Sequence, residues 1–274
     1  MAEYKNVEKP FLDKLRQLNW EVIDQGSFGI PHDPSKSLRT SFKEVTLKER
    51  FKSAVSKINS NNGIEWLTDK QLNDLFDEVI IFDPAYDSYA PAIALNGGKA
   101  VHIALHAPDY RVNWQQVADA VTARTRLIIV NSPHNPSGMV FSRSDWLALQ
   151  QLVSAHNLYC ISDEVYEHMV FDGAAPLSAN GFSELAARSF IVSSFGKTFH
   201  VTGWKLGYCV APALLSSEFR KIHQYVTFSS FTPAQYAIAD MLAEHSEQVQ
   251  GLAAFYQQKR DSFAALLANS RFTL

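Results

Sequence analysis

Residues 193–207 have the sequence SSFGKTFHVTGWKLG, which places a single lysine, Lys197, just after an apolar run. The preceding residues, SFIVSS, are apolar and β-branched, and they predict a strand that ends at Ser194. Open α/β sheets bind ligands at the carboxyl ends of their strands, so this position favours a functional lysine. The alternative is a solvated loop lysine, because lysine is rarely buried without a partner.

Apolar runs of strand length recur through the second part of the chain. They are EVIIFD (78–83), AVHIAL (100–105), RLIIVNS (126–132), LYCIS (158–162), FIVSS (190–194) and GYCVA (207–211). Segments with helical character lie between several of them, at 114–123, 144–156 and 214–224. Near-continuous apolar strands that alternate with helices predict an α/β fold, in which a mostly parallel sheet carries helices on both faces.

Composition limits the class of protein. The chain has 274 residues, of which 46% are hydrophobic and 19% charged, and this describes a soluble globular protein with one large or two medium domains. The net charge of −3 gives no general reason to expect nucleic acid or an anionic membrane as a partner. The polar start MAEYKNVEKP is unlike a signal peptide, and no apolar run approaches the roughly 20 residues of a transmembrane helix.

The two cysteines, Cys160 and Cys209, lie in the apolar stretches NLYCIS and LGYCVAP. Cysteines in such stretches predict buried thiols in a reducing compartment. Together with the polar N-terminus, they favour a cytoplasmic protein.

Charge density changes sharply along the chain. Residues 1–77 contain 12 Lys/Arg and 12 Asp/Glu, whereas residues 78–274 contain 13 and 16. About a third of the first segment is therefore charged, against about a seventh of the second. This shift predicts two segments of different origin, 1–77 and 78–274.

The first segment predicts short helices joined by loops. Amphipathic helices are expected around 11–18, around 47–58 and from Thr68 onward, and NSNNG (59–63) is expected to end the second. Scattered acids in this segment are more typical of surface charge than of metal ligands: Asp13, Asp24 and Asp33.

The stretches EKPFLDKLRQLNWEVIDQG (8–26) and SLRTSFKEVTLKERF (37–51) resemble the N-terminal part of the restriction subunit of type I restriction–modification enzymes. In that family the nuclease carboxylates and lysine come later in the domain. The resemblance ends near Asp77, before any such residues. It therefore implies a restriction-like segment without a nuclease active site.

Four strand ends of the second segment are followed by residues with useful chemistry. The exits are PAYDSYA, PHNPSG, DEVYEH and FGKTF, which offer an aromatic ring, an amide, an acid with a phenol, and a lysine. A lysine amine can form an imine with an aldehyde, and an acid can hold a pyridine nitrogen protonated. A phenol and an amide can bond a phenolate oxygen, and an aromatic ring can cover a heterocycle. Together these groups are what pyridoxal 5′-phosphate requires, although an isolated Asp or Asn after a strand is commonly a helix cap or turn residue.

Three motifs, NSPHNPSG (131–138), SDEVYEHMVF (162–171) and SSFGKTFHVTGWKLGYCVAP (193–212), resemble class I pyridoxal-phosphate aminotransferases. The resemblance is greatest to the branch that includes methionine, glutamine and kynurenine aminotransferases, and it covers about 78–274. It implies the large domain of the fold type I pyridoxal-phosphate transferases. It also implies transfer of an amino group from a methionine-like, glutamine or aromatic amino acid to a 2-oxo acid, by a family that forms homodimers.

The resemblance assigns roles to five residues of the expected site. Lys197 matches the lysine that forms the Schiff base with the cofactor, and Asp163 matches the acid that binds the pyridinium nitrogen. Tyr166 and Asn135 match the pair that bonds the ring oxygen O3′, and Tyr86 matches the aromatic residue stacked on the ring.

The resemblance also assigns the phosphate group. Ser194 and Lys205 match its ligands, and lysine contacts phosphate as a point charge without the bidentate fork of arginine. Many relatives have serine at position 196 and arginine at 205, so Gly196 and Lys205 indicate the glycine-and-lysine branch. Pro133 and Pro136 are expected to hold the Asn135 loop through a cis peptide or a plain turn.

Two parts of the family pattern are expected to be missing. Relatives bind the phosphate also through a small-residue loop before the first strand, and they carry a substrate-binding arginine in a smaller C-terminal domain. Neither is recognised in this sequence, and Arg271 does not match that arginine. We therefore expect weak cofactor capture with little or no transamination, and the homodimer of the family is one that residues 1–77 could block. The alternative is an inactive chimeric or truncated remnant, or a restriction-associated DNA-binding fragment.

Overall fold

A computed structural model of the chain describes residues 77–271 and, before them, residues 9, 13, 16–17, 60–61 and 64–65. The chain divides into two compact units. One consists of 1–76 with 91–98, and the other of 77–90 with 99–274.

Before residue 77, the described residues of the first unit are helical residues 9, 13 and 16–17 and two short strands. Asp13 is helical and pairs with Arg16 at 2.6 Å, which agrees with its interpretation as a surface charge. Strand β1 (Ser60–Asn61) pairs antiparallel with β2 (Ile64–Glu65). Ser60 and Asn61 of the NSNNG stretch are extended, and the helix that this stretch is expected to end lies outside the described residues. The helices expected around 47–58 and from Thr68 onward lie outside the described residues, as do the acids Asp24 and Asp33.

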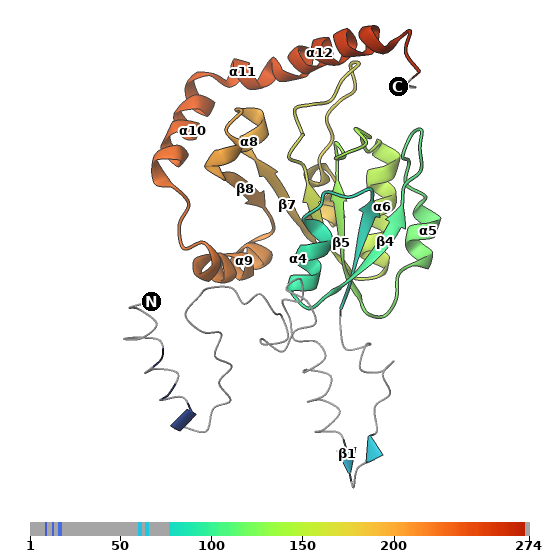
Figure 1. The fold of residues 1–274 in the computed structure, drawn as a ribbon, viewed down its shortest axis with the longest axis vertical. Helices are drawn as coiled ribbons and strands as arrows, with labels where there is room; N and C mark the ends of the chain where they lie inside the picture. The colour runs from blue at the N-terminus through green and yellow to red at the C-terminus, as the bar shows by residue number, and fades with distance from the viewer. Residues whose placement is uncertain are drawn as a thin grey trace. The chain divides into compact units, whose positions relative to one another are not determined.

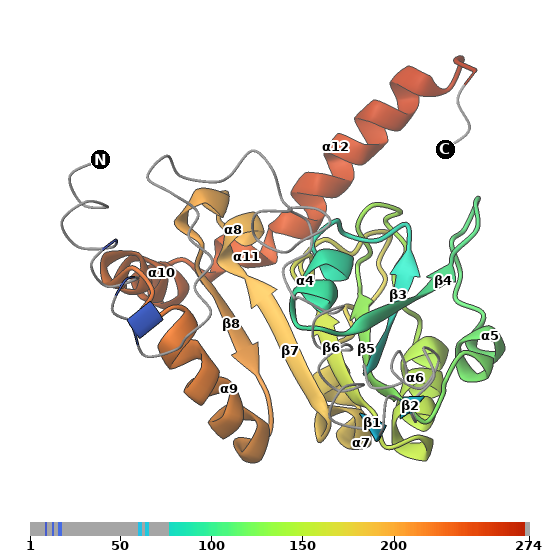
Figure 2. The ribbon, with the colours of Figure 1, turned by 60° about the horizontal axis from the view of Figure 1, so that its bottom comes forward.

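The second unit is built on a six-stranded sheet with the order β4-β3-β5-β6-β7-β8, which can be followed from right to left in Figure 2. Its strands are β3 (Glu78–Asp83), β4 (Lys99–Ala104), β5 (Thr125–Asn131), β6 (Tyr159–Asp163), β7 (Ser189–Ser194) and β8 (Gly207–Val210). All neighbours pair parallel except β7 and β8, which are antiparallel. The predicted mostly parallel α/β sheet is confirmed.

Helices alternate with these strands, as Figure 1 shows. They are α4 (Tyr89–Leu95), α5 (Trp114–Asp119), α6 (Arg143–Ala155), α7 (Ser183–Ala186), α8 (Phe195–Thr198), α9 (Ala213–Val226), α10 (Thr232–Glu244), α11 (Ser246–Gln250) and α12 (Leu252–Leu267), with 3₁₀ turns η3 (Ala179–Gly181) and η4 (Thr202–Trp204). The helix expected over 114–123 ends at Asp119. It ends there because Thr122 and Arg124 form a turn whose side chains bind Glu78.

Strand order places the functional edge of the sheet. From β3 the chain goes to its neighbour β4 on one side and then crosses to β5 on the other side. Ligands of open α/β sheets bind where the order reverses in this way, outside the carboxyl ends of the strands. The carboxyl ends of β3, β5, β6 and β7 are consecutive at that edge, and they are the four exits with useful chemistry.

Both faces of the sheet are covered. On one face, Ile80, Ile128 and Cys160 belong to a core that includes Trp146 of α6, which has no exposed surface. Trp146 stacks on Phe182 with ring centroids 6.0 Å apart. Burying such a side chain contributes on the order of 1.5–3 kcal/mol. The opposite face carries the buried side chains of Val79, Ile81 and Ile129. Helix α9 packs on this face through Phe219, whose ring centroid lies 6.3 Å from that of Phe190.

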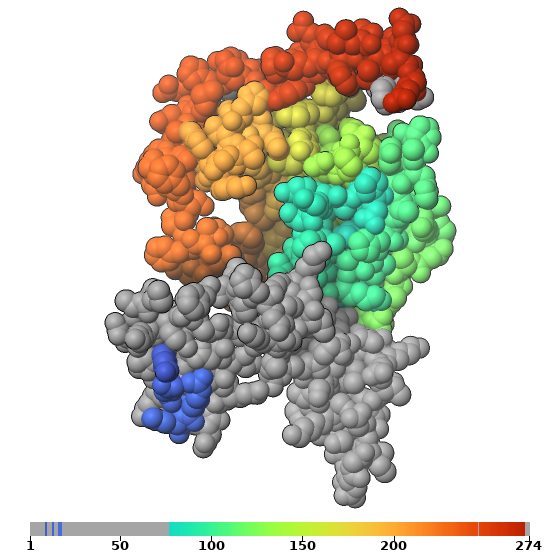
Figure 3. Space-filling view, in the orientation of Figure 1, coloured from blue at the N-terminus to red at the C-terminus, as the bar shows by residue number. Residues whose placement is uncertain are grey.

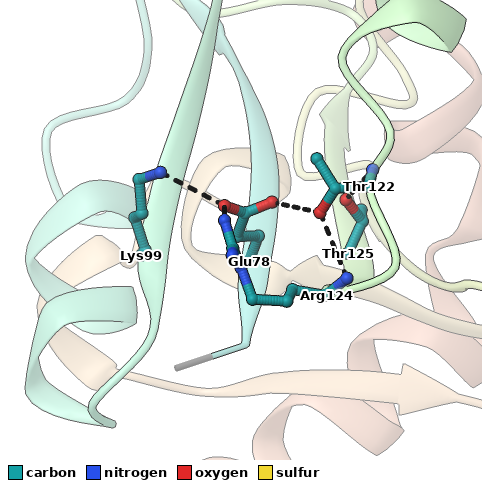
Figure 4. A network of polar contacts seen from close by, with 5 residues as sticks. All are labelled: Glu78, Lys99, Thr122, Arg124 and Thr125. Carbon is teal, nitrogen blue, oxygen red and sulfur yellow. Dashed lines mark hydrogen bonds and ion pairs between the residues drawn. The ribbon is translucent and has the colours of Figure 1, made fainter. Parts of the chain in front are cut away.

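A buried carboxylate ties the amino ends of the strands together (Figure 4). Glu78, 1% exposed, accepts hydrogen bonds from Arg124 Nη2 and Thr122 Oγ1, both at 2.6 Å, and from Lys99 Nζ at 3.1 Å. Burial acts to raise the pKa of Glu78, but these bonds and the charge of Lys99 outweigh it and lower the pKa to about 2. The network joins β3 to β4 and to the turn before β5, at the end of the sheet opposite the functional edge.

The two cysteines differ in burial. Cys160 of β6 is fully buried as predicted, and burial raises the pKa of its thiol to about 12. Cys209 was expected to be buried, and this was wrong, because β8 is an edge strand and leaves the thiol partly exposed. Among the helices of the described residues, none combines the length and apolar character needed to cross a bilayer.

Candidate active site

A cavity of about 360 Å³ opens at the functional edge of the sheet. All seven residues singled out from the sequence line it: Tyr86, Asn135, Asp163, Tyr166, Ser194, Lys197 and Lys205. Six of them come from the exits of β3, β5, β6 and β7, which are consecutive in the sheet, and Lys205 follows the turn η4 before β8. The topology therefore gathers residues that lie far apart in the sequence on a single cavity.

Asp163 is the last residue of β6 and stands at the cavity wall. Its Oδ2 accepts a 2.5 Å hydrogen bond from the Tyr89 hydroxyl, and its Oδ1 accepts one from the Val165 N–H at 3.2 Å. Burial, with the nearby charge of Asp163, raises the pKa of Tyr89 far above its ordinary value. Tyr89 therefore stays protonated and donates, and the carboxylate is held in one orientation.

Tyr89 was not predicted, although it lies in the quoted stretch PAYDSYA. The available signal was its spacing: it follows Tyr86 by three residues and begins α4, so a turn brings the two rings together. Their centroids are 5.6 Å apart, at an interplanar angle of 79°.

The loop after β5 is fixed by Asn131, another residue that sequence reasoning missed. Its Nδ2 donates to the Asp163 carbonyl at 2.9 Å, and its Oδ1 accepts from the Asn135 N–H at 2.7 Å. The peptides Ser132–Pro133 and Asn135–Pro136 are both cis, in agreement with the expectation for this loop. One amide side chain thus joins the ends of β5 and β6 and sets the place of Asn135. The sequence feature that could have revealed Asn131 is its place at the start of the NSPHNPSG motif.

Lys197 lies on the single-turn helix α8, which Ser194 caps. The Ser194 hydroxyl accepts the Gly196 N–H at 3.0 Å. A Cβ at Gly196 would lie 2.9 Å from the Thr202 Cα, so the close approach of the two segments requires glycine here. The Thr202 hydroxyl donates to the Gly196 carbonyl at 3.1 Å. These contacts fix the backbone beneath the lysine, and Thr202 is a further cavity residue that the sequence did not reveal.

Lys205 follows the turn η4 in a left-handed conformation, with φ of 53°. It returns the chain to Leu206, whose carbonyl accepts the Phe195 N–H at 3.1 Å. The turn therefore brings Lys205 back to the same cavity as Ser194 and Lys197. The Lys205 side chain and the Ser194 hydroxyl on one cavity suit a dianionic ligand group.

Tyr166 and Asn135 line two cavities, the one described above and a larger one of about 620 Å³. Burial, followed by the charges of Asp163 and Tyr86, raises the pKa of Tyr166, so its hydroxyl remains a donor. The larger cavity is bordered by Asp172 and by Arg260 of α12, which form a bidentate pair at 2.5 and 2.7 Å. The red α12 extends along one edge of this unit in Figure 3. This cavity includes neither Lys197 nor Asp163, so the smaller one is the candidate site.

Comparison with known proteins identifies the family. Residues 66–274 match the family model described as aminotransferase class I and II. The chain belongs to this family. The match begins at residue 66, within the first of the two expected segments. It confirms the resemblance to class I aminotransferases that the sequence motifs indicated.

Individual aminotransferases agree with the family match. The chain is 53% identical over 198 residues to methionine aminotransferase of Escherichia coli, which covers 72% of this chain and 51% of the relative. A solved Escherichia coli structure reported with a methionine aminotransferase function has a TM-score of 0.70 at 54% identity, covering 72% of this chain and 52% of that one. A probable N-succinyldiaminopimelate aminotransferase of Mycobacterium tuberculosis is 40% identical over 200 residues, covering 72% of this chain and 50% of the relative. The chain spans about half the length of these curated relatives.

Proposed function

We propose that this aminotransferase-family chain acts with pyridoxal 5′-phosphate to transfer an amino group from an amino acid to a 2-oxo acid. The observation that carries the proposal is the convergence of Lys197 and Asp163 on one cavity at the carboxyl edge of the sheet. An amine and a carboxylate placed together in this way can hold the aldehyde and the ring nitrogen of one ligand.

The chemistry of the cavity suits this cofactor. Its volume of about 360 Å³ falls within the usual range for small-ligand sites, about 300–1,000 Å³. Ser194 and Lys205 would hold the phosphate, and Tyr86 would cover the ring. When bound, pyridoxal phosphate supplies an electron sink for the negative charge that develops at the substrate α-carbon.

The side chains of the protein would perform the remaining tasks. The Lys197 amine would hold the aldehyde carbon until the substrate amine displaces it. The freed amine would then take the proton of the substrate α-carbon and deliver it to the former aldehyde carbon. The Asp163 carboxylate, held by Tyr89, would accept the N–H of the protonated ring nitrogen and favour its positive charge. Tyr166 and Asn135 would donate to the ring oxygen O3′.

Substrates and partners follow from the relatives. The Escherichia coli relative is named for methionine, and a Dictyostelium discoideum relative, 36% identical over 205 residues, is a kynurenine–oxoglutarate transaminase. A methionine-like, glutamine or aromatic amino acid is therefore the proposed donor, and a 2-oxo acid the acceptor. We take a second copy of the chain as the partner. Four aromatic side chains on and beside α9 and α10 are at least 68% exposed and are available to pack against that copy: Tyr225, Phe228, Phe231 and Tyr236.

The test is the absorbance of the purified chain titrated with pyridoxal phosphate. We expect a visible band from the lysine-bound cofactor, which Lys197→Ala abolishes. Lys221→Ala is the matched control, because Lys221 is an exposed lysine that pairs with Glu218 at 2.6 Å. A band that persists in Lys197→Ala, or that never forms with the wild-type chain, would overturn the proposal and favour a remnant without cofactor chemistry.

The transfer itself is tested with methionine, glutamine and an aromatic amino acid, each combined with several 2-oxo acids. We expect weak turnover with at least one pair, lost in Lys197→Ala and kept in Lys221→Ala. Cofactor binding without turnover for any pair would contradict the proposed transfer while leaving the cofactor site intact.

A further inference from the structure

A group of hydrogen bonds beside the candidate site is centred on the carboxylate of Glu167. One oxygen of this side chain, Oε1, accepts hydrogen bonds from the Ser193 hydroxyl at 2.7 Å and from the Tyr208 hydroxyl at 2.6 Å. The His168 ring nitrogen Nε2 lies 3.8 Å from the same oxygen. None of the roles assigned above uses Glu167.

The two donors occupy matched positions on neighbouring strands. Ser193 of β7 and Tyr208 of β8 are cross-strand partners in the antiparallel ladder, next to the pair Ser194 and Gly207. Glu167 therefore bridges a strand pair directly before the helix that carries Lys197. Ser193 is only 8% exposed, so its hydroxyl needs a partner within the protein. Of its two acceptors, Glu167 Oε1 at 2.7 Å is nearer than the Glu164 carbonyl oxygen at 3.3 Å.

On its other side, Glu167 belongs to the segment that carries Asp163 and Tyr166. Its N–H donates to the Glu164 carbonyl at 2.8 Å, in a turn, and the Glu164 N–H donates to the Val192 carbonyl at 2.8 Å. The parallel ladder between β6 and β7 ends at the pair Asp163 and Val192. Beyond this point the chain leaves the sheet, and side-chain bonds must hold the two exits in place.

The Glu167 bonds meet this need. Charge-assisted hydrogen bonds are shorter and stronger than neutral ones, and the two distances agree with that class. Burial, with the Glu167 hydrogen bond, raises the pKa of Tyr208 to about 12, so Tyr208 stays a donor at neutral pH. One carboxylate oxygen thus connects the exits of β6 and β7 and the edge strand β8.

We propose that Glu167 is a positioning residue that holds the segment of Asp163 and Tyr166 in register with the segment of Ser194 and Lys197. This inference rests on the proposed function. Without the Glu167 bonds, the ring-nitrogen and O3′ partners could shift against the lysine, although each would remain in the chain.

The first experiment is the spectral titration with pyridoxal phosphate on Glu167→Ala and Glu167→Gln. Alanine removes the acceptor, so we expect affinity to fall roughly tenfold, the factor expected for one charged hydrogen bond. We also expect the pH midpoint of the visible band to shift, because it reports the O3′ partners. Glutamine keeps a carbonyl acceptor for the two hydroxyls. It should bring the affinity for pyridoxal phosphate to within about threefold of wild type, since a neutral hydrogen bond is about half as strong as a charge-assisted one. Glu218→Ala, which removes an exposed carboxylate, is the control.

The second experiment needs no cofactor. In the cofactor-free chain, the amides of residues 164 and 167 should lose protection from hydrogen exchange, relative to their intrinsic rates, in Glu167→Ala and keep it in Glu218→Ala. If Glu167→Ala does not fold, the double variant Ser193→Ala with Tyr208→Phe removes both donors and keeps the carboxylate, and the same faster exchange is expected.

The two proposals fail in different ways. A wild-type chain without a lysine-dependent band overturns the proposed function, and this inference with it. A normal wild-type band, with unchanged affinity, pH midpoint and amide exchange in Glu167→Ala or in the double variant, overturns only the role of Glu167.

Discussion

The Tyr89 hydroxyl donates a 2.5 Å hydrogen bond to the Asp163 carboxylate, joining residues 74 positions apart in the chain. Tyr89 follows the exit of β3 and Asp163 ends β6, so the bond spans the cavity edge. It places a protonated phenol on the acid proposed to bind the cofactor ring nitrogen. The orientation of that carboxylate is therefore set before any ligand arrives.

Tyr89→Phe tests this bond, because it keeps the ring and removes the hydroxyl. We expect pyridoxal phosphate to bind about threefold to tenfold more weakly, the range expected for one hydrogen bond to a charged group. Spectral titration measures the change. Tyr159→Phe is the matched control, since Tyr159 begins the same strand β6 and is 45% exposed. Equal losses in the two variants would show that the Tyr89 hydroxyl has no specific role.

Lys205→Ala separates the phosphate contact from the rest of the site. We expect pyridoxal phosphate to bind at least about tenfold more weakly, since a charged contact is lost. Pyridoxal, which lacks the phosphate, should bind the variant and the wild type equally. If Lys205→Ala weakened both ligands by the same factor, Lys205 would be a structural residue and not a phosphate ligand.

Gly207→Ala tests how tightly β8 lies against β7. A Cβ at this position would approach the Ser193 carbonyl oxygen to 2.5 Å, and this atom belongs to the backbone. We expect the free energy of unfolding to fall by about 1–3 kcal/mol, the usual cost of overpacking. Gly181→Ala is the control, because no atom lies within 4 Å of its added Cβ. Urea unfolding measures both, and equal stabilities would contradict the close approach.

Glu78 predicts a specific loss of stability in acid. Its pKa is lowered from 4.5 to about 2 in the folded protein, so its contribution is complete above the unfolded value and is lost as the pH falls from about 5 towards 2. The shift corresponds to on the order of 3 kcal/mol. Glu78→Gln should therefore be less stable than wild type at pH 7, with a difference that shrinks at pH 3. Urea unfolding at both values checks this, and a constant difference would argue against the linkage.

Local patterns in the sequence were sufficient to predict the architecture and the strand exits that line the cavity, whereas Ser194 and Lys205 were assigned through the resemblance to the family. Apolar runs such as EVIIFD mark strands buried on both faces, and parallel strands necessarily bring their exits to one edge. Lys197, Asp163 and Asn135 could therefore be placed together without coordinates. Their roles toward the cofactor remain proposals.

Residues that act through long-range geometry escaped prediction. Tyr89, Asn131 and Glu167 hold other groups, and their partners are set by strand register and loop path. The early end of α5 has the same origin, since Thr122 and Arg124 bind a carboxylate 44 and 46 positions away. Cys209 was misjudged because an apolar stretch does not reveal whether its strand lies at the edge of the sheet.

The crossing from β4 back to β5 has a consequence for the order of folding. Helical and hairpin proteins form most contacts between residues close in sequence. Strand β3, by contrast, pairs with β5, which follows β4 and α5 in the chain. High contact order of this kind slows folding, because the chain loses entropy before its pairings repay it. The cavity is complete only when β7 and β8 have joined, so its ligand recognises a late state. Pyridoxal phosphate present during refolding should therefore leave the early kinetic phases unchanged and stabilise only the final species.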